Sequence, residues 1–312
     1  MKSLLILSLL AAPAAAQTVQ YSTQLDQPQS AVSWSVSSSI GTVNVSPSNF
    51  NLGGSIELLT DSVNAPFTTG AINGATVFTS PNTLSGEIPN ILPFLPPLAT
   101  FDITGLQFDL TAPTFQVDPA GDFIAVVTLT TTAGINTLGG LFGSGSDPVT
   151  GIVSTPTPVT GNLSQSGTTI TLFLDLNVQV VLDDPVSGIS STLDVTGPVV
   201  ATVDTANANS MHLDRPLPLI AGAPNTVQVN NATPGGAVFL AGSLTGLGSI
   251  FIAPLGVTSG LAAPVQAGTA TADALGNASF SLNVPAGFVG RAVWLQALET
   301  GRTSNAAGTW VE

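Results

Sequence analysis

Hydrophobic and polar residues alternate along much of the chain. Between Thr169 and Asp183 every even position is apolar, and most odd positions are polar. A period of two over such a length is typical of a β-strand with one buried side and one solvent-facing side. In 101–110 the alternation changes phase at Gly105, which predicts a bulge or bend. Further stretches with the alternating pattern are 30–45, 123–129 and 189–203.

These patterns predict an all-β protein, since no sustained helical period follows residue 16. Strands this long usually coil, and a meander of coiled antiparallel strands closes into a barrel. We therefore expect an antiparallel β-barrel over residues 17–205, with a deep two-sheet β-sandwich as the alternative. A membrane barrel needs girdles of aromatic residues. Three tryptophans and one tyrosine are too few for that.

The composition changes near residue 205. Small polar residues are followed by the stiff sequence Arg215-Pro216-Leu217-Pro218, which predicts a linker over 206–217 and a second domain over 218–312. In that domain, Pro234-Gly235 has the composition of a turn. Residues 291–298 are apolar on both faces of the expected strand, which favours a central position in a sheet.

Two segments resemble known families. Four motifs of the last third, closed by Ser304-Asn305, occur in the order found in a module at the C-terminal end of many large secreted bacterial proteins of unknown function. This resemblance implies a small immunoglobulin-like β-sandwich, accessory and not catalytic, although the cysteine pair common in that module is absent. The start of the chain resembles the YceI family of secreted lipid-binding barrels. The motifs of the module are 221–227, 232–235, 272–278 and 290–297, and those of the YceI resemblance are 21–26, 30–36 and 50–56.

The first sixteen residues have the pattern of a secretory signal peptide. A short positive start, an apolar run over 4–12 and small residues at 14–16 precede Gln17. The apolar run is shorter than the roughly 20 residues that a membrane span requires. We expect a protein without a transmembrane segment after cleavage, located outside the cell or at its surface, with the periplasm as the alternative.

The charge and composition exclude several classes. The formal net charge is −14, which repels the phosphates of nucleic acids. Hydrophobic residues make up 44% of the chain, too many for a disordered acidic protein. Without any cysteine, disulfides and thiolate metal sites are excluded. We expect no nucleic-acid partner and no cofactor.

Few residues could support catalysis. His212 is the single histidine, and no G-x-S-x-G motif accompanies it, so we expect a structural or solvated side chain and no enzyme activity. Paired carboxylates leave a glycosidase-like hydrolase as a third alternative. Three pairs near expected turns have oxygen ligands that suit calcium, although turn capping is the favoured role. They are Asp183 with Asp184, Asp118 with Asp122, and Asp273 with Asn277.

One apolar segment, 88–98, contains four prolines and links two expected strands. Prolines prevent a regular helix or central strand there. The favoured interpretation is a plug that closes one end of the barrel; the alternative is an exposed rim that contacts an apolar ligand, a lipid or a partner. Residues 134–143 are the candidate facing rim. The candidate side chains are Ile91, Leu92, Phe94, Leu95, Leu138 and Phe142.

Together these observations favour a secreted, non-catalytic surface or matrix protein that acts through binding or assembly with a cell-surface component. The alternative is a carrier that holds an apolar small molecule or lipid inside its barrel. The interior of the barrel distinguishes the two, since bulky side chains that fill it favour the first and a void lined by small ones favours the second.

Overall fold

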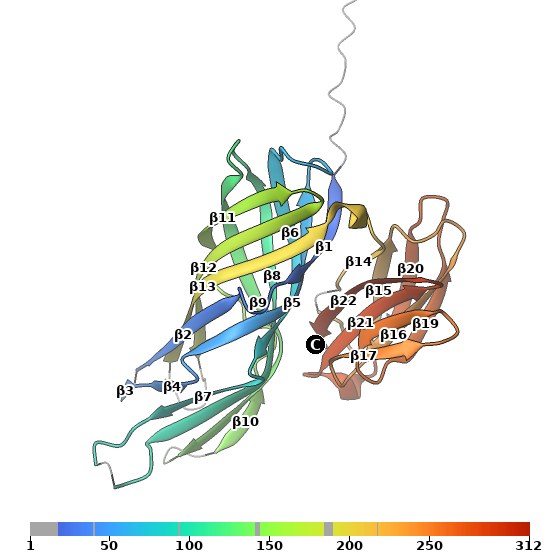
Figure 1. Ribbon diagram of the computed structural model, residues 1–312. Coiled ribbons are helices and arrows are strands. Elements are labelled where there is room, and N and C mark those ends of the chain that lie inside the picture. The colour runs from blue at the N-terminus through green and yellow to red at the C-terminus, as the bar shows by residue number, and fades with distance from the viewer. Residues whose placement is uncertain (1–17, 40, 93, 141–143, 184–189, 217) are drawn as a thin grey trace, which may run out of the picture.

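The computed structural model describes residues 18–39, 41–92, 94–140, 144–183, 190–216 and 218–312. Regular structure in these residues is β-strand apart from two short 3₁₀ helices (Figure 1). The N-terminal strands are β1 (Val19–Leu25), β2 (Ala31–Ser38), β3 (Gly41–Thr42), β4 (Asn44–Ser46), β5 (Asn49–Thr60), β6 (Thr69–Ser80), β7 (Thr83–Ile88), β8 (Ala99–Gln116), β9 (Asp122–Gly140), β10 (Gly145–Pro148), β11 (Thr157–Ser166), β12 (Thr169–Asp183) and β13 (Ser190–Asp204).

Eight of these strands form a closed antiparallel barrel. Their order is β9-β11-β12-β13-β1-β5-β6-β8, and pairing of β8 with β9 completes the circle. Strands β1 and β2 occupy successive parts of one position, because both pair with β13 on one side and β5 on the other. The predicted all-β barrel is therefore confirmed. Strand β12 has the bounds that the alternation predicts.

Strands β8 and β9 continue beyond the barrel. The first part of β8, 99–104, pairs with β7 and with residues 135–140 of β9, and β4 and β10 form the edges of this extension. The register of β8 against β9 shifts between Thr104 and Gln107, around Gly105, whose φ is 70°. The bulge predicted at Gly105 is confirmed. It lies where β8 passes from the extension into the barrel wall.

Four glycines in the sheet lie directly opposite phenylalanines of the neighbouring strand. A Cβ atom added to any of these glycines would lie 2.3–2.5 Å from the paired ring, so each ring covers the glycine backbone. Two of the rings, Phe115 and Phe123, also stack on each other with centroids 4.2 Å apart. The pairs are Gly53–Phe78, Gly70–Phe115, Gly86–Phe101 and Gly161–Phe123.

The C-terminal strands form a two-sheet sandwich. One sheet has the order β14-β15-β20 and the other β19-β16-β21-β22, with β17 and β18 as a separate hairpin. Strand β21 lies between β16 and β22, which confirms the central position predicted from its apolar faces. The elements are η1 (Thr205–Asn207), β14 (His212–Leu213), β15 (Pro224–Asn230), β16 (Ala237–Ser243), β17 (Leu247–Ile252), β18 (Val257–Leu261), β19 (Val265–Thr271), β20 (Ala278–Asn283), η2 (Ala286–Phe288), β21 (Ala292–Glu299) and β22 (Arg302–Trp310).

The segment predicted as a linker, 206–217, is partly built into the sandwich. His212 and Leu213 pair with β15, and Met211 and Leu213 are buried in the core between the two sheets. The prediction of a linker over the whole of 206–217 is therefore wrong for residues 211–213, which belong to the sandwich. The pattern of two apolar residues around a histidine is too short for periodicity to reveal a strand.

Candidate functional site

The apolar loop 89–98 lies at the tip of the extension, where β7 and β8 meet away from the barrel (Figure 1). Ile91 is 93% exposed and Phe94 79%, and Leu92 and Leu95 are also exposed. The plug interpretation is wrong for these four side chains. The physical reason is that β7 and β8 extend past the end of the barrel, so the loop between them does not reach the core.

Hydrogen bonds give the loop a defined shape. Asn90 accepts a hydrogen bond from the backbone N–H of Leu92 (3.2 Å) and donates one to the carbonyl of Pro96 (3.3 Å). The N–H of Leu95 binds the carbonyl of Leu92 (3.0 Å). No charged residue occurs between Glu87 and Asp102. The tip is therefore an uncharged apolar surface held by the Asn90 side chain.

The candidate facing rim is only partly visible. Leu138 lies on β9 opposite Phe101 of β8 and is half-buried, next to the base of the tip. Phe142 lies outside the described residues.

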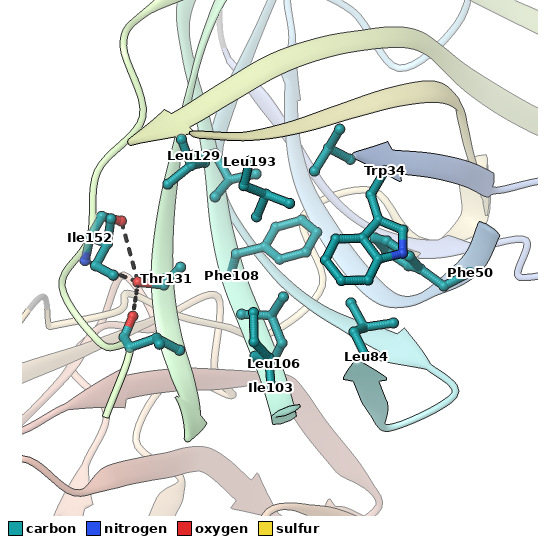
Figure 2. Close-up of a pocket in the computed structure, with 13 residues that line it drawn as sticks. Trp34, Phe50, Leu84, Ile103, Leu106, Phe108, Leu129, Thr131, Ile152 and Leu193 are labelled. Carbon is teal, nitrogen blue, oxygen red and sulfur yellow. Dashed lines mark hydrogen bonds between the residues drawn. The ribbon is translucent and has the colours of Figure 1, made fainter. Parts of the chain in front are cut away.

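The interior of the barrel is filled by side chains. Its apolar cavity measures about 30 Å³, room for on the order of one or two water molecules. Figure 2 shows the lining side chains pointing toward one another, with Trp34 and Phe50 on one side and Thr131 and Ile152 on the other. Thr131 is the one polar residue of this lining, and its hydroxyl donates to the carbonyl of Val149.

A polar region lies where the sandwich contacts the outer wall of the barrel. Glu57 of β5 and His212 are both 4% exposed, and Glu57 Oε2 lies 3.0 Å from His212 Nδ1. On the other side of the ring, His212 Nε2 lies 3.3 Å from Asp214 Oδ1. Asp214 also accepts a hydrogen bond from Asn230 (3.0 Å), and Glu57 accepts one from Ser22 (3.0 Å).

An arginine–aspartate pair lies next to this histidine. Arg215 forms an ion pair with Asp109 of β8, which is 3% exposed. The ion pair uses Arg215 Nη1, and Arg215 Nη2 donates a hydrogen bond to the hydroxyl of Thr76 of β6 (2.8 Å). A Cβ atom at Gly74 would lie 3.3 Å from Asp109 and 3.9 Å from the Arg215 guanidinium, so glycine leaves room for the pair. We name the cluster of Glu57, His212, Asp214, Arg215 and Asp109 the interdomain charge cluster.

The cluster has a chemical consequence for His212. Burial lowers the pKa of His212, but hydrogen bonding to Asp214 and Glu57 and their negative charges raise it to about 9. The hydrogen bond from His212, together with the one from Asn230, lowers the pKa of Asp214 below its usual range, although partial burial raises it. A buried imidazolium between two carboxylates is a structural cation and a poor general base. Because His212 is 4% exposed, the solvated alternative is wrong, and the structural role stays a prediction.

The sequence did not identify the barrel side of this cluster. Glu57 and Asp109 alternate with core residues and so occupy the face expected to meet solvent. The available signal was the scarcity of cations, since His212 and Arg215 stand three residues apart in a chain with three arginines.

The carboxylate pairs near turns act as caps. Asp118 Oδ1 accepts hydrogen bonds from the backbone N–H groups of Ala120 (2.8 Å) and Asp122 (2.9 Å). Asp273 Oδ1 does the same with Leu275 (2.8 Å) and Asn277 (2.9 Å). Turn capping is therefore confirmed for both pairs. The third pair, Asp183 with Asp184, lies outside the described side chains.

Two further findings concern the described part of the chain only. It contains no group of three or more His, Cys, Asp or Glu side chains placed to hold a metal ion. Its helices include none that is long and apolar enough to cross a membrane.

Comparison with known proteins gives little. No protein-family model and no curated protein matches the chain. Among solved structures, the chain is similar to Salmonella alpha-2-macroglobulin reacted with methylamine, at 10% sequence identity and a TM-score of 0.26. The match covers 91% of this chain and 37% of that one, and a similarity this low carries no argument about fold or function.

Proposed function

We propose that the protein is a secreted, non-catalytic binding protein that contacts an apolar partner surface through the tip loop 89–98. The observation that carries this proposal is the exposure of Ile91, Leu92, Phe94 and Leu95 on one short loop. Contiguous exposed apolar groups on a soluble protein mark contact sites for lipids or partners. The tip loop also lies at the end of β7 and β8 away from the barrel, where the barrel does not cover it (Figure 1).

The loop is prepared for contact before a partner arrives. Its prolines and the two hydrogen bonds of Asn90 limit its conformations, so little entropy is lost on binding. Since the tip is uncharged while the chain carries a net charge of −14, an uncharged apolar surface suits it better than an anionic one.

Two other functions have less support. A carrier needs an internal void, whereas the cavity of about 30 Å³ is too small for a lipid. A histidine-dependent enzyme needs a ring nitrogen free to accept a proton, whereas both nitrogens of His212 lie against carboxylates. The sandwich then serves as an accessory module, in keeping with the immunoglobulin-like module that its motifs resemble.

The test compares Phe94→Asp with a matched control, Phe251→Asp. Phe251 is 65% exposed on β17 of the sandwich, so both variants place a carboxylate on the surface. Binding is measured by cosedimentation with phosphatidylcholine vesicles and by retention on an octyl-agarose column. Removing one Phe contact is expected to weaken binding about tenfold or more in Phe94→Asp, and to leave Phe251→Asp like the wild type.

Thermal unfolding completes the test. Because Phe94 is exposed, the melting temperature of Phe94→Asp is expected to match that of the wild type. A clearly lower melting temperature would mean that the loop is packed in the core. Equal binding by wild type, Phe94→Asp and Phe251→Asp on both surfaces would reject the proposed tip contact.

A further inference from the structure

The joint between barrel and sandwich combines a small apolar cluster with buried charges. Trp294 lies in a buried apolar cluster to which, among the described residues, the barrel contributes only Ala133. The joint also contains the interdomain charge cluster, the Trp310 ring next to Gly151 of the barrel, and hydrogen bonds such as Gly308 N–H to Thr76 (3.3 Å). Charged side chains are therefore buried in this joint, where removing one partner leaves the other without compensation.

His212 is the charged group on which the cluster depends. Its Nδ1 lies 3.0 Å from Glu57 Oε2, and its Nε2 lies 3.3 Å from Asp214 Oδ1. A neutral ring would hold an unshared electron pair toward one of its two carboxylate neighbours at 3.0–3.3 Å, which is repulsive in a buried site. A ring with a proton on each nitrogen therefore fits best between the two carboxylates.

The groups that face His212 come from each neighbouring element. Glu57 comes from β5, and Asp214 and Arg215 from the histidine's own segment. Asp109 of β8 lies behind Arg215, and the neutral residues Asn230 of β15 and Ser22 of β1 bind the two carboxylates. When His212 loses its proton, three carboxylates face one remaining cation. Breaking one partner of a buried ion pair leaves the other charge without compensation, which is strongly unfavourable.

We propose that the interdomain charge cluster is a pH-dependent latch: protonated His212 holds the sandwich against the barrel, and loss of this proton at alkaline pH releases it. Releasing the joint returns Glu57 and Asp109 to water, where their charges need no partner. Each domain has its own buried core, so separation leaves both cores intact.

The composition makes this titration simple to assign. The chain has no cysteine, one histidine, one tyrosine and, as its single lysine, Lys2 in the expected signal peptide. Burial raises the pKa of Tyr21 above its usual value of 10. With the pKa of His212 at about 9, a transition between neutral pH and pH 10 in the protein without its signal peptide reports His212 or the amino terminus, and variants separate these two.

The experiment measures the radius of gyration by small-angle X-ray scattering from about pH 6.5 to pH 10. The wild type is expected to stay compact at neutral pH and to expand near pH 9. In Glu57→Gln one of the two carboxylates that hold the proton is neutral, so the midpoint is expected to move about one unit or more toward neutral pH. His212→Gln is expected to be expanded at every pH. Asp273→Asn, a surface change within a turn, is the control and is expected to behave like the wild type.

Two results would overturn the latch. One is a constant radius of gyration for the wild type over the whole range. The other is an unchanged midpoint in Glu57→Gln, which would assign any expansion to another group. Tryptophan fluorescence on each sample checks folding, because Trp34 lies in the barrel and Trp294 at the joint. If His212→Gln does not fold, the Glu57→Gln midpoint alone decides.

Discussion

Gln107 of the barrel accepts a hydrogen bond of 2.6 Å from the indole N–H of Trp294 in the sandwich. The bulge after Thr104 shifts the register of β8 on both sides of Gln107 and directs this side chain toward the sandwich. Gly308 lies beside this bond, and a Cβ atom there would be in van der Waals contact with both Gln107 and Trp294 at 3.4 Å. A local irregularity of one strand thus fixes a contact between domains.

This hydrogen bond can be measured with a double-mutant cycle. Gln107→Ala, Trp294→Phe and the double variant are unfolded with urea. We expect a coupling of about 1 kcal/mol, since the bond is partly buried and neutral. The exposed pair Gln228 and Ser279 is the comparison and is expected to give a coupling near zero. A coupling near zero for Gln107 with Trp294 would contradict the assignment.

The pH dependence of stability follows from His212. Its pKa is 6.5 when unfolded and about 9 when folded, so the folded state binds the proton more tightly. The resulting stabilisation is present in full below pH 6.5 and is lost as the pH rises to 9. The free energy of unfolding is expected to fall by on the order of 3 kcal/mol across this window.

Urea unfolding at several pH values from about 6 to 9.5 measures this loss. In His212→Gln the free energy of unfolding should be nearly constant over the same range. A wild-type stability that stays level or increases with pH would show that the histidine is not held as a cation.

The glycine at position 276 is required for two separable reasons. Its φ is 83°, and an added Cβ would lie 2.5 Å from the carbonyl oxygen of Ala232. Gly222 has a similar φ of 72° with nothing within 4 Å of the added atom. We expect Gly222→Ala to cost about 1 kcal/mol from backbone conformation alone, and Gly276→Ala to cost about 2 kcal/mol more from the collision. Equal costs in thermal unfolding would mean that the backbone moves aside at Ala232.

The sandwich should fold alone only if its first strand is included. Leu213 and Met211 belong to its core, so a fragment 210–312 is expected to unfold cooperatively. A fragment 216–312 lacks both side chains and is expected to be several kcal/mol less stable or unfolded. Circular dichroism during heating compares the two fragments. Equal melting curves would mean that β14 adds nothing to the core.

Alternation of residues predicted the strands well because the core-facing side of each strand is apolar whatever packs against its outer side. The inner side of β12 must be apolar in a barrel whose interior is filled by side chains, and the bounds of β12 follow directly from the pattern. The slip at Gly105 is equally local, since a bulge changes the parity of the residues that follow it.

The sites were less predictable because they depend on what covers the outer side. Glu57 and Phe78 both point out of the barrel, and nothing in the alternation tells which of them the sandwich will bury. The plug prediction for the tip loop is wrong for a related reason: its apolar residues suggest a core, but the length of β8 places Phe94 away from the core. Whether the loop reaches the core depends on how far β7 and β8 extend past the other strands of the barrel. The alternation pattern does not reveal this difference in length.

The four Gly–Phe pairs described above favour the native strand register over shifted ones during folding. In a long sheet, a one-residue slip exchanges the two faces of a strand. A misaligned Gly161, for example, would leave the Phe123 ring against a side chain in place of bare backbone, and the error would be sterically costly at once. Because barrels depend on contacts between distant residues and close slowly, early rejection of wrong alignments shortens the search for the native one.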